Sequence, residues 1–449
     1  MTRTFGVTVM PEWAQAEGIA AVLDRLQAAG VNAIATSPYV MAPAEEGQGG
    51  REPPIDAGAG SVRLLDRPLW GKRELWCRTA PSFAPDRQRY QGLRYQPPEP
   101  DGLTAREGAV VARFLEAAKA RGMEVQLQVQ AAIPPGYRVQ FSADQGEDEL
   151  RLPDGSKPAR RVDRNASLAS VEVRGYLGAL LADLTAAYPM VDAIRIDWPE
   201  YPPYTLEAVF TDFSPPAKQA AVRLGYDVEA MRAEAAEVLA GLRAGTLDLE
   251  ALDRLGDLWR FKADLVVELL QVARDALPPA IRLLPQSFPR PWALLSGFDH
   301  ARAATVVQGM GVKLYTMHWP MMARFWAEAL GGVDAARRVV RFLDVGGPEP
   351  QTLDHLRYPE PEEAHPVGAD AQRRKLEAAV TAAAPCPVYA FAHSYGPLDD
   401  VVARFRLAWE APVAGVWVNR YGYLSDAKIA ALGGMVSGGP PRLGATDPG

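Results

Sequence analysis

Two carboxyl groups three residues apart, those of Asp197 and Glu200, have the surroundings that acid–base chemistry requires. They lie in the run VDAIRIDWPEYPPY, residues 191–204. Alternation along a strand places Arg195 on the same face as Asp197, so its guanidinium is expected to hold that carboxylate ionised. The apolar neighbours of Glu200 are expected to raise the pKa of its carboxyl group. Such a pair suits cleavage of glycosidic bonds, with Asp197 as nucleophile or transition-state stabiliser and Glu200 as proton donor.

A purely structural interpretation of these residues stays open. Arg195 and Asp197 would then form a buried ion pair that only orders the end of the strand, and Glu200 would be a solvated loop residue. If the pair is catalytic, we expect a retaining mechanism, which requires carboxyl groups about 5 Å apart.

Short apolar segments alternate with longer amphipathic ones along the chain, which predicts parallel strands connected by helices. An open doubly wound sheet usually has a glycine-rich turn after its first strand, and the turn MPEWAQAEG has no such pattern. The sequence therefore predicts the α/β class and a (β/α)8 TIM barrel with long loop insertions at its catalytic face. The eight expected strands cover residues 5–10, 31–36, 123–131, 191–197, 281–286, 312–317, 388–392 and 415–418.

A single catalytic domain is expected over residues 1–436. Three segments are too long for plain connections and are predicted to be excursions over the barrel mouth, at 41–103, 201–250 and 346–368. The last segment, 437–449, is rich in glycine and proline and is predicted to be a flexible tail.

Candidate substrate-binding residues follow from the fold, because the active site of such a barrel lies at the carboxyl ends of its strands. Amides, carboxylates and imidazoles can bind sugar hydroxyls, and aromatic rings can stack on pyranose faces. For the two histidines, a role as hydrogen-bonded rim residues stays equally open. The candidates are Glu12, Tyr39, Gln130, Arg195, Trp198, Gln286, Tyr315, His318, Trp319, His393, Asn419, Arg420 and Tyr421.

The run DAIRIDWPEYPPY resembles the fourth-strand signature of the family-10-like glycosyl hydrolases, barrel enzymes related to the α-amylase clan. Their pattern is roughly D-G-I-x-x-D-Y-x-x-Y-P. The resemblance implies a barrel glycosidase in which Asp197 is the nucleophile. The matching residues are Asp192, Ile194, Asp197, Trp198, Tyr201 and Pro202, with Ala193 in place of the glycine.

The chain departs from the clan at two further acidic positions. The clan places its general acid on strand five and another acid after strand seven, where this sequence has Gln286 and His393. Either Glu200 or Glu12 then supplies the acid, or the chemistry differs from that of the amylases.

Composition limits the other classes of function. The net charge of -7 does not indicate the positively charged surface that nucleic-acid binding requires. No uninterrupted apolar run reaches about 18 residues, so no membrane span is expected. We expect a cytoplasmic protein, because the amino-terminal residues lack a signal-peptide pattern. The two cysteines, Cys77 and Cys386, form no CxxC pair, and no HxH, HExxH, G-x-G-x-x-G or Walker A motif occurs. No metal and no cofactor are therefore expected.

The expected partner is a carbohydrate substrate, and the oligomeric state is left open. Two alternatives to a glycoside hydrolase or transglycosidase remain at this point. One is a barrel isomerase or lyase acting on a small polar metabolite. The other is a catalytically silent carbohydrate-binding barrel, since a fold does not fix a function.

Overall fold

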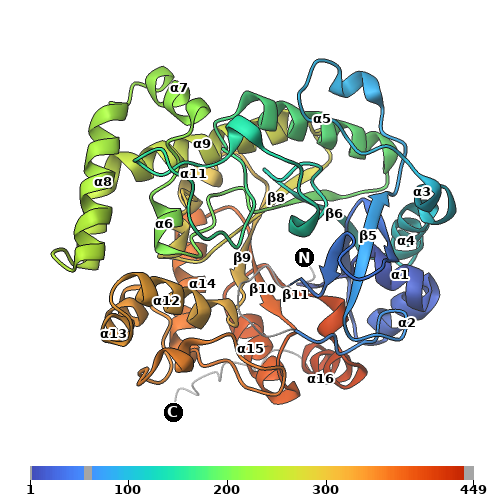
Figure 1. Cartoon of the computed structure of the whole chain (residues 1–449). Helices are drawn as coiled ribbons and strands as arrows, with labels where there is room; N and C mark the ends of the chain where they lie inside the picture. The colour runs from blue at the N-terminus through green and yellow to red at the C-terminus, as the bar shows by residue number, and fades with distance from the viewer. Residues whose placement is uncertain (1–2, 55–62, 439–449) are drawn as a thin grey trace, which may run out of the picture.

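The computed structural model describes residues 3–54 and 63–438 of the chain. Eight parallel strands form a closed barrel in the order β1, β2, β6, β7, β8, β9, β10 and β11, and β11 pairs with β1 (Figure 1). The predicted (β/α)8 barrel is confirmed. The strands are β1 (Thr4–Thr8), β2 (Ala33–Thr36), β6 (Glu124–Gln130), β7 (Ala193–Asp197), β8 (Arg282–Ser287), β9 (Met310–Leu314), β10 (Val388–His393) and β11 (Gly415–Asn419).

Helices surround the barrel and follow its strands along the chain (Figure 1). The main helices are α1 (Pro11–Glu17), α2 (Ile19–Ala28), α3 (Gly102–Glu107), α4 (Ala109–Ala120), α5 (Val171–Ala187), α9 (Gly256–Asp275), α12 (His318–Ala329), α13 (Val333–Phe342), α14 (Ala369–Ala383), α15 (Leu398–Glu410) and α16 (Asp426–Ser437).

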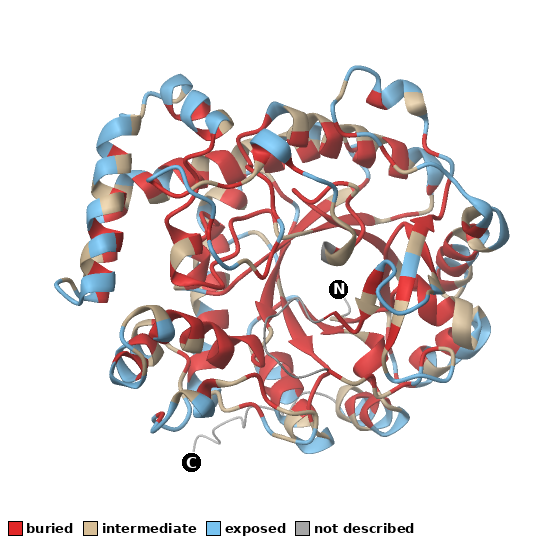
Figure 2. Cartoon of the chain, viewed as in Figure 1, coloured by how far each residue is buried: buried red, intermediate tan, exposed pale blue. Residues whose placement is uncertain are grey.

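An amphipathic pattern decides which face each helix buries. In α9, Leu258, Leu265 and Leu269 recur at helical spacing and are buried, whereas Arg260 and Gln271 are exposed. Figure 2 shows the same division for the whole molecule, with buried barrel strands and exposed outer faces of the helices. The core therefore lies between the strands and the surrounding helices.

Large side chains that face glycines on neighbouring strands fill the interior of the barrel. A Cβ atom on Gly6 would lie 2.4 Å from the Trp417 ring, and one on Gly311 would lie 2.3 Å from the Phe391 ring. The two rings stack with their centroids 6.1 Å apart, and the Arg195 guanidinium lies 3.9 Å from the centroid of the Trp417 ring. This layer fills the barrel beneath the carboxyl ends of the strands.

The segment after β2 leaves the barrel and forms a three-stranded antiparallel sheet in the order β3, β5, β4. These strands are β3 (Tyr39–Pro43), β4 (Gly50–Glu52) and β5 (Leu75–Pro81). They fall mostly within the predicted excursion 41–103. We call them the insert sheet.

The other two predicted excursions are also more than plain loops. Residues 201–250 contain α6 (Leu206–Val209), α7 (Pro215–Arg223) and α8 (Val228–Ala244), and α8 projects from the barrel in Figure 1. Residues 346–368 contain the short helix η5 (Leu353–Leu356). Of the predicted tail, Ser437 is the last residue of α16, and 439–449 lie outside the described residues.

Two further properties bear on the sequence analysis. In the described part of the chain, no helix combines the length and apolar character needed to cross a membrane. Both Cys77 and Cys386 are free thiols.

Candidate active site

A cavity of about 110 Å³ opens at the carboxyl ends of the barrel strands. Several predicted site residues line it, and each lies at or just after a strand end. Among the residues that the structure describes, Asp197 is the only carboxylate in this lining. The lining residues predicted from the sequence are Gln130, Asp197, Trp198, Tyr315, His318, His393, Asn419 and Arg420.

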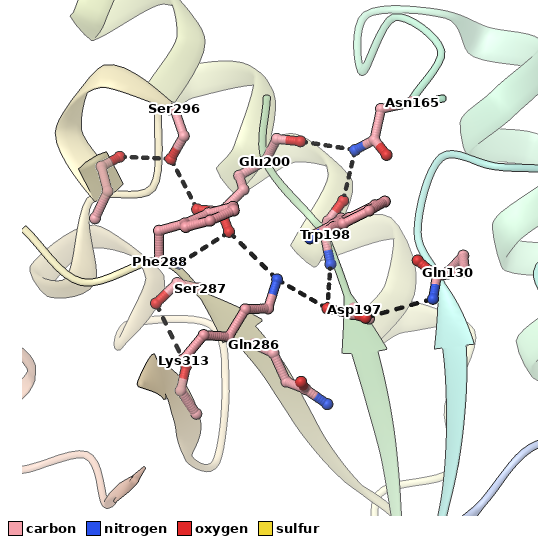
Figure 3. A network of polar contacts seen from close by, with 12 residues as sticks. Gln130, Asn165, Asp197, Trp198, Glu200, Gln286, Ser287, Phe288, Ser296 and Lys313 are labelled. Atoms are coloured by element: carbon pink, nitrogen blue, oxygen red, sulfur yellow. Dashed lines mark hydrogen bonds and ion pairs between the residues drawn. The ribbon is translucent and has the colours of Figure 1, made fainter. Parts of the chain in front are cut away.

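Asp197 is the last residue of β7, and its two carboxylate oxygens have different partners (Figure 3). Oδ1 accepts the backbone N–H of Trp198 at 3.0 Å and lies 2.8 Å from the ammonium nitrogen of Lys313. Among the described residues, Oδ2 has only a long contact, 3.4 Å, with the amide nitrogen of Gln130. The carboxylate is thus fixed through one oxygen, and the other is less engaged.

Arg195 forms no ion pair with Asp197 in the described structure, although their charges interact. Arg195 does point into the barrel, as the alternation predicts, but its guanidinium donates to Thr8 Oγ1 at 2.9 Å and to Gln126 Oε1 at 2.8 Å. Burial lowers the pKa of Arg195 to about 9. Side chains of β1 and β6 occupy this guanidinium one layer deeper in the barrel, and Lys313 of β9 takes the predicted place beside Asp197.

Glu200 is fully buried and does not line the cavity. Its Oε1 accepts the backbone N–H of Phe288 at 3.0 Å, and its Oε2 accepts the hydroxyl of Ser296 at 2.7 Å. Burial raises the pKa of Glu200 to about 7, against the opposing charge of Lys313. The predicted direction of this pKa shift is therefore present, but the carboxyl group does not face the cavity where a proton donor is needed.

The backbone of Trp198 adopts a strained conformation. Its φ of 50° lies in the left-handed region, which costs a bulky residue on the order of 1–3 kcal/mol. Its ring lies 6.0 Å from that of Tyr204 at an interplanar angle of 76°. The buried amide of Asn165 donates to the backbone carbonyls of Trp198 at 2.9 Å and of Glu200 at 2.8 Å. These hydrogen bonds hold the unusual turn that puts the indole in the cavity wall and Glu200 behind it.

The two predicted histidines line the cavity as neutral imidazoles. Burial lowers the pKa of His318 to about 3, and it also lowers the pKa of His393 well below its usual value. His318 Nδ1 lies 3.3 Å from the Tyr204 hydroxyl, and Nδ1 of His393 accepts the backbone N–H of Tyr395 at 3.1 Å. His318 Nε2 is buried and has no hydrogen-bond partner in the described structure. A neutral imidazole suits hydroxyl binding and is a poor proton donor.

Glu12 and Tyr39 lie behind the cavity wall, in an ion network at the rim. The Tyr39 hydroxyl donates to Glu12 Oε2 at 3.0 Å, and Arg138 Nη1 donates to Glu12 Oε1 at 3.1 Å. Arg138 Nη2 lies 2.6 Å from Glu52 Oε2, and Arg420 Nη2 donates to Glu52 Oε1 at 2.6 Å. Glu52 belongs to β4, so this chain of charges connects the insert sheet to the barrel through Arg138 and Arg420, which both line the cavity.

Three other predicted binding residues do not line the cavity. The amide of Gln286 donates to Gln128 Oε1 at 3.0 Å, inside the barrel. Trp319 is buried against Trp292, with ring centroids 5.3 Å apart. The Tyr421 hydroxyl donates to Glu17 at 2.9 Å. All three are buried packing residues in this structure.

No protein-family model and no curated protein sequence matches the chain. Several solved structures resemble it. A β-galactosidase from the psychrophilic Marinomonas ef1 is 12% identical, with a TM-score of 0.53 over 97% of this chain and 59% of that one. The catalytic domain of a β-amylase from Paenibacillus polymyxa is 10% identical, with a TM-score of 0.49, covering 98% of this chain and all, 100%, of that one. A Group IV chitinase from Ostrinia furnacalis is 8% identical, with a TM-score of 0.46, covering 97% and 100%.

These neighbours are glycoside hydrolases. At such low identity the likeness to the β-galactosidase shows the fold alone, and this chain spans 59% of that enzyme's length. Nothing in the comparisons singles out the family-10-like group among the barrel glycosidases.

Sequence reasoning missed Lys313, Arg138 and Glu52. Lys313 had a signal, because alternation along KLYT puts it on the same inward face as Tyr315, and a lysine inside a barrel strand is rare. Arg138 and Glu52 lie in segments outside the barrel strands, where no periodicity shows direction. Their role depends on a contact between the insert sheet and the rim.

The strained backbone at Trp198 leads to a test with an unusual order of stabilities. We expect Trp198→Gly to be more stable than Trp198→Ala by about 1 kcal/mol, because only glycine adopts a positive φ freely. Both variants should bind saccharides more weakly, since both lose the indole. Urea unfolding and titration calorimetry measure the two effects.

Tyr204, which also lines the cavity, has no positive φ and is the matched control. There the usual order should hold, with the alanine variant the more stable. An alanine variant of Trp198 that is more stable than its glycine variant would show that the turn carries no strain.

Proposed function

We propose that this protein is a glycoside hydrolase in which Asp197 acts on the anomeric carbon of a bound glycoside or oligosaccharide. One observation carries the proposal. Asp197 is the only carboxylate among the described residues that lines the cavity, and it is followed at once by a strained Trp198 whose ring forms part of the same wall. The glycosidase neighbours of the fold support it.

The cavity offers the contacts that a sugar ring needs. Amides of Gln130 and Asn419, the neutral imidazole of His318 and the rings of Trp198 and Tyr315 all line it. Asp197 at the strand end is suited to stabilise the positive charge that develops at the anomeric carbon, or to attack it and form a glycosyl-enzyme intermediate. Attack would give the retaining outcome that the sequence predicts.

The absence of a second carboxylate from the described lining changes the expected mechanism. A general acid typically contributes about 10²–10⁴-fold to the rate. If the acid is missing, as it is among the described lining residues, turnover should depend strongly on the leaving group. We therefore expect hydrolysis of dinitrophenyl glycosides, whose phenolate leaves without protonation, and slow hydrolysis of alkyl glycosides.

A panel of dinitrophenyl and methyl glycosides that covers the common pyranoses in both anomeric forms tests the proposal. Turnover of one dinitrophenyl glycoside, with the product anomer followed by proton nuclear magnetic resonance, supports it. The presence of one carboxylate among the described lining residues also favours a second candidate, a carbohydrate-binding barrel without turnover. Saccharide binding by calorimetry with no hydrolysis of any dinitrophenyl glycoside would favour that candidate and contradict the first.

The role of Glu200 can be separated from that of Asp197. Because Glu200 does not face the cavity, we expect Glu200→Gln to lower kcat/KM by less than about tenfold on both dinitrophenyl and alkyl glycosides. A proton donor behaves differently, since its loss spares activated substrates and slows alkyl glycosides by about 10²–10⁴-fold. If Glu200→Gln slows alkyl glycosides strongly but spares dinitrophenyl glycosides, Glu200 is the acid that the sequence predicts.

The same variant should alter the pH dependence of stability. The pKa of Glu200 is raised from 4.5 to about 7 by burial, so its neutral form is the one that the fold favours. The resulting stability is fully present below about pH 4.5 and is lost as the pH rises through about 7. Glu200→Gln removes this loss, which urea unfolding at several pH values would show as a flatter profile.

A further inference from the structure

Lys313 is a buried cation between two carboxyl groups, and the predicted chemistry assigns it no role. It belongs to β9, and its side chain is 1% exposed. Its ammonium nitrogen lies 2.8 Å from Asp197 Oδ1 and 3.8 Å from Glu200 Oε1, and Figure 3 shows it between them. Taking an ammonium group out of water is costly unless charges compensate it, so these carboxyl groups determine where it sits.

The two carboxyl groups compete unequally for this ammonium group. Asp197 is the closer one, and its Oδ1 also accepts the backbone N–H of Trp198. Glu200 has two neutral donors of its own, Phe288 N–H and the Ser296 hydroxyl. Since the pKa of Glu200 is about 7, a large fraction of this group is neutral near neutral pH, and the lysine charge then acts mainly on Asp197.

No other cation of the described structure ion-pairs with Asp197. Arg195 is one layer deeper and is held by Thr8 and Gln126. Just after β9, Tyr315 lies near the carboxylate with a hydroxyl whose pKa is raised by burial, and β6 contributes the neutral amide of Gln130. Among the described residues, Lys313 is therefore the cation at ion-pair distance from Asp197.

The lysine also orients the carboxylate. Lys313 and the Trp198 N–H both contact Oδ1, whereas Oδ2 has, within residues 3–54 and 63–438, only the 3.4 Å contact with Gln130. A carboxylate anchored through one oxygen presents the other in a fixed direction, which is the pre-organisation that attack or charge stabilisation requires.

We infer that Lys313 is a positioning residue for Asp197, which anchors Oδ1 of this carboxylate through an ion pair and leaves Oδ2 as the oxygen that acts on the sugar. The inference rests on the proposed function for its catalytic consequence, but the charge state of Asp197 can be measured without any substrate.

The test compares Lys313→Met, which removes the charge at nearly the same length, with Lys313→Gln, which keeps a hydrogen-bond donor without the charge. In both variants we expect the acid limb of the kcat/KM profile to move to higher pH by about one unit or more. On the acid side of this limb, activity at a given pH should fall by about tenfold or more and should recover as the pH rises. A merely structural lysine would lower activity equally at all pH values, and that result would overturn the inference.

Lys262 is the matched control. It is also fully buried, and its ammonium group donates to the backbone carbonyls of Val209 at 2.7 Å and Leu295 at 3.2 Å, away from the cavity lining. Lys262→Met should lose stability and leave the position of the acid limb unchanged. If the acid limb of the kcat/KM profile shifts as far in Lys262→Met as in Lys313→Met, the effect is common to any buried lysine.

A readout without substrate separates the inference from the proposed function. The carboxyl carbon of Asp197 can be followed by carbon-13 nuclear magnetic resonance during a pH titration and assigned by its absence from Asp197→Asn. We expect its titration midpoint to rise in Lys313→Met and Lys313→Gln. An unchanged midpoint would overturn the inference even if the enzyme is active. A risen midpoint in a protein that hydrolyses no glycoside would support the role of Lys313 and reject the proposed function.

Discussion

Asp197→Asn is expected to lower kcat/KM for an activated glycoside by about 10⁴-fold or more, which corresponds to about 5 kcal/mol of lost transition-state stabilisation. The amide has nearly the shape of the carboxylate and can still accept the Trp198 N–H. It removes the negative charge that the developing cation at the anomeric carbon requires. The fold should persist, because Glu200, 3.8 Å from Lys313, can ionise and compensate the ammonium group. Circular dichroism and steady-state kinetics measure the two effects.

A carboxylate on the same stretch of chain provides the control. Asp192 lies just before β7, at the opposite end of the barrel, where it accepts the Val125 N–H at 2.9 Å and pairs with Lys119. Asp192→Asn should leave turnover unchanged. Asp197→Asn that retains more than about a tenth of the activity would remove Asp197 from the chemistry.

Azide distinguishes a nucleophile from a group that only stabilises charge. In Asp197→Gly, azide can enter the vacated space and form a bond from its nitrogen to the anomeric carbon as the bond to the phenolate oxygen breaks. We expect a glycosyl azide of inverted configuration, because the ion attacks from the side that the carboxylate occupied. Restored turnover without this product would leave Asp197 as a stabiliser and would contradict the retaining mechanism.

The sequence predicted the barrel and the position of Asp197 for physical reasons that operate over short distances. Alternation within β7 was enough to put Arg195 and Asp197 inside, and both side chains do point inward. The identity of the cation could not be found this way. Lys313 is two strands away from β7 in the barrel, and it reaches Asp197 only because a lysine side chain is long enough to cross that distance.

The place of Glu200 depended on a backbone conformation that sequence patterns do not predict. Trp198 adopts a positive φ that bulky residues avoid, and the buried amide of Asn165 stabilises the turn by binding two carbonyls. This turn sends Glu200 toward Ser296 and away from the cavity. The spacing of three residues indicated two carboxyl groups near the end of β7, but it could not show which of them faces the cavity.

The second large effect concerns the rim, where we expect Arg138→Met to reduce the free energy of unfolding by about 3–5 kcal/mol. Arg138 is the cation that lies between Glu12 and Glu52, with contacts of 3.1 and 2.6 Å, and both carboxylates are almost fully buried. Without it, two buried negative charges share only Arg420, which pairs with Glu52. Urea unfolding would measure the loss, and limited proteolysis would report whether the insert sheet separates from the barrel.

The pH dependence of the stability lost in Arg138→Met identifies the cause of that loss. Burial already raises the pKa of Glu12, and removal of the neighbouring guanidinium raises it further. A carboxyl group with a raised pKa favours the fold in its neutral form, so the variant should regain stability as the pH falls and lose it as the pH rises. Arg51 in the same strand as Glu52 pairs with the half-exposed Glu74, and Arg51→Met should cost only about 0–1 kcal/mol at any pH. If Arg138→Met costs no more than this control, the ion network does not hold the insert sheet, and the arginines at the rim are available to bind substrate instead.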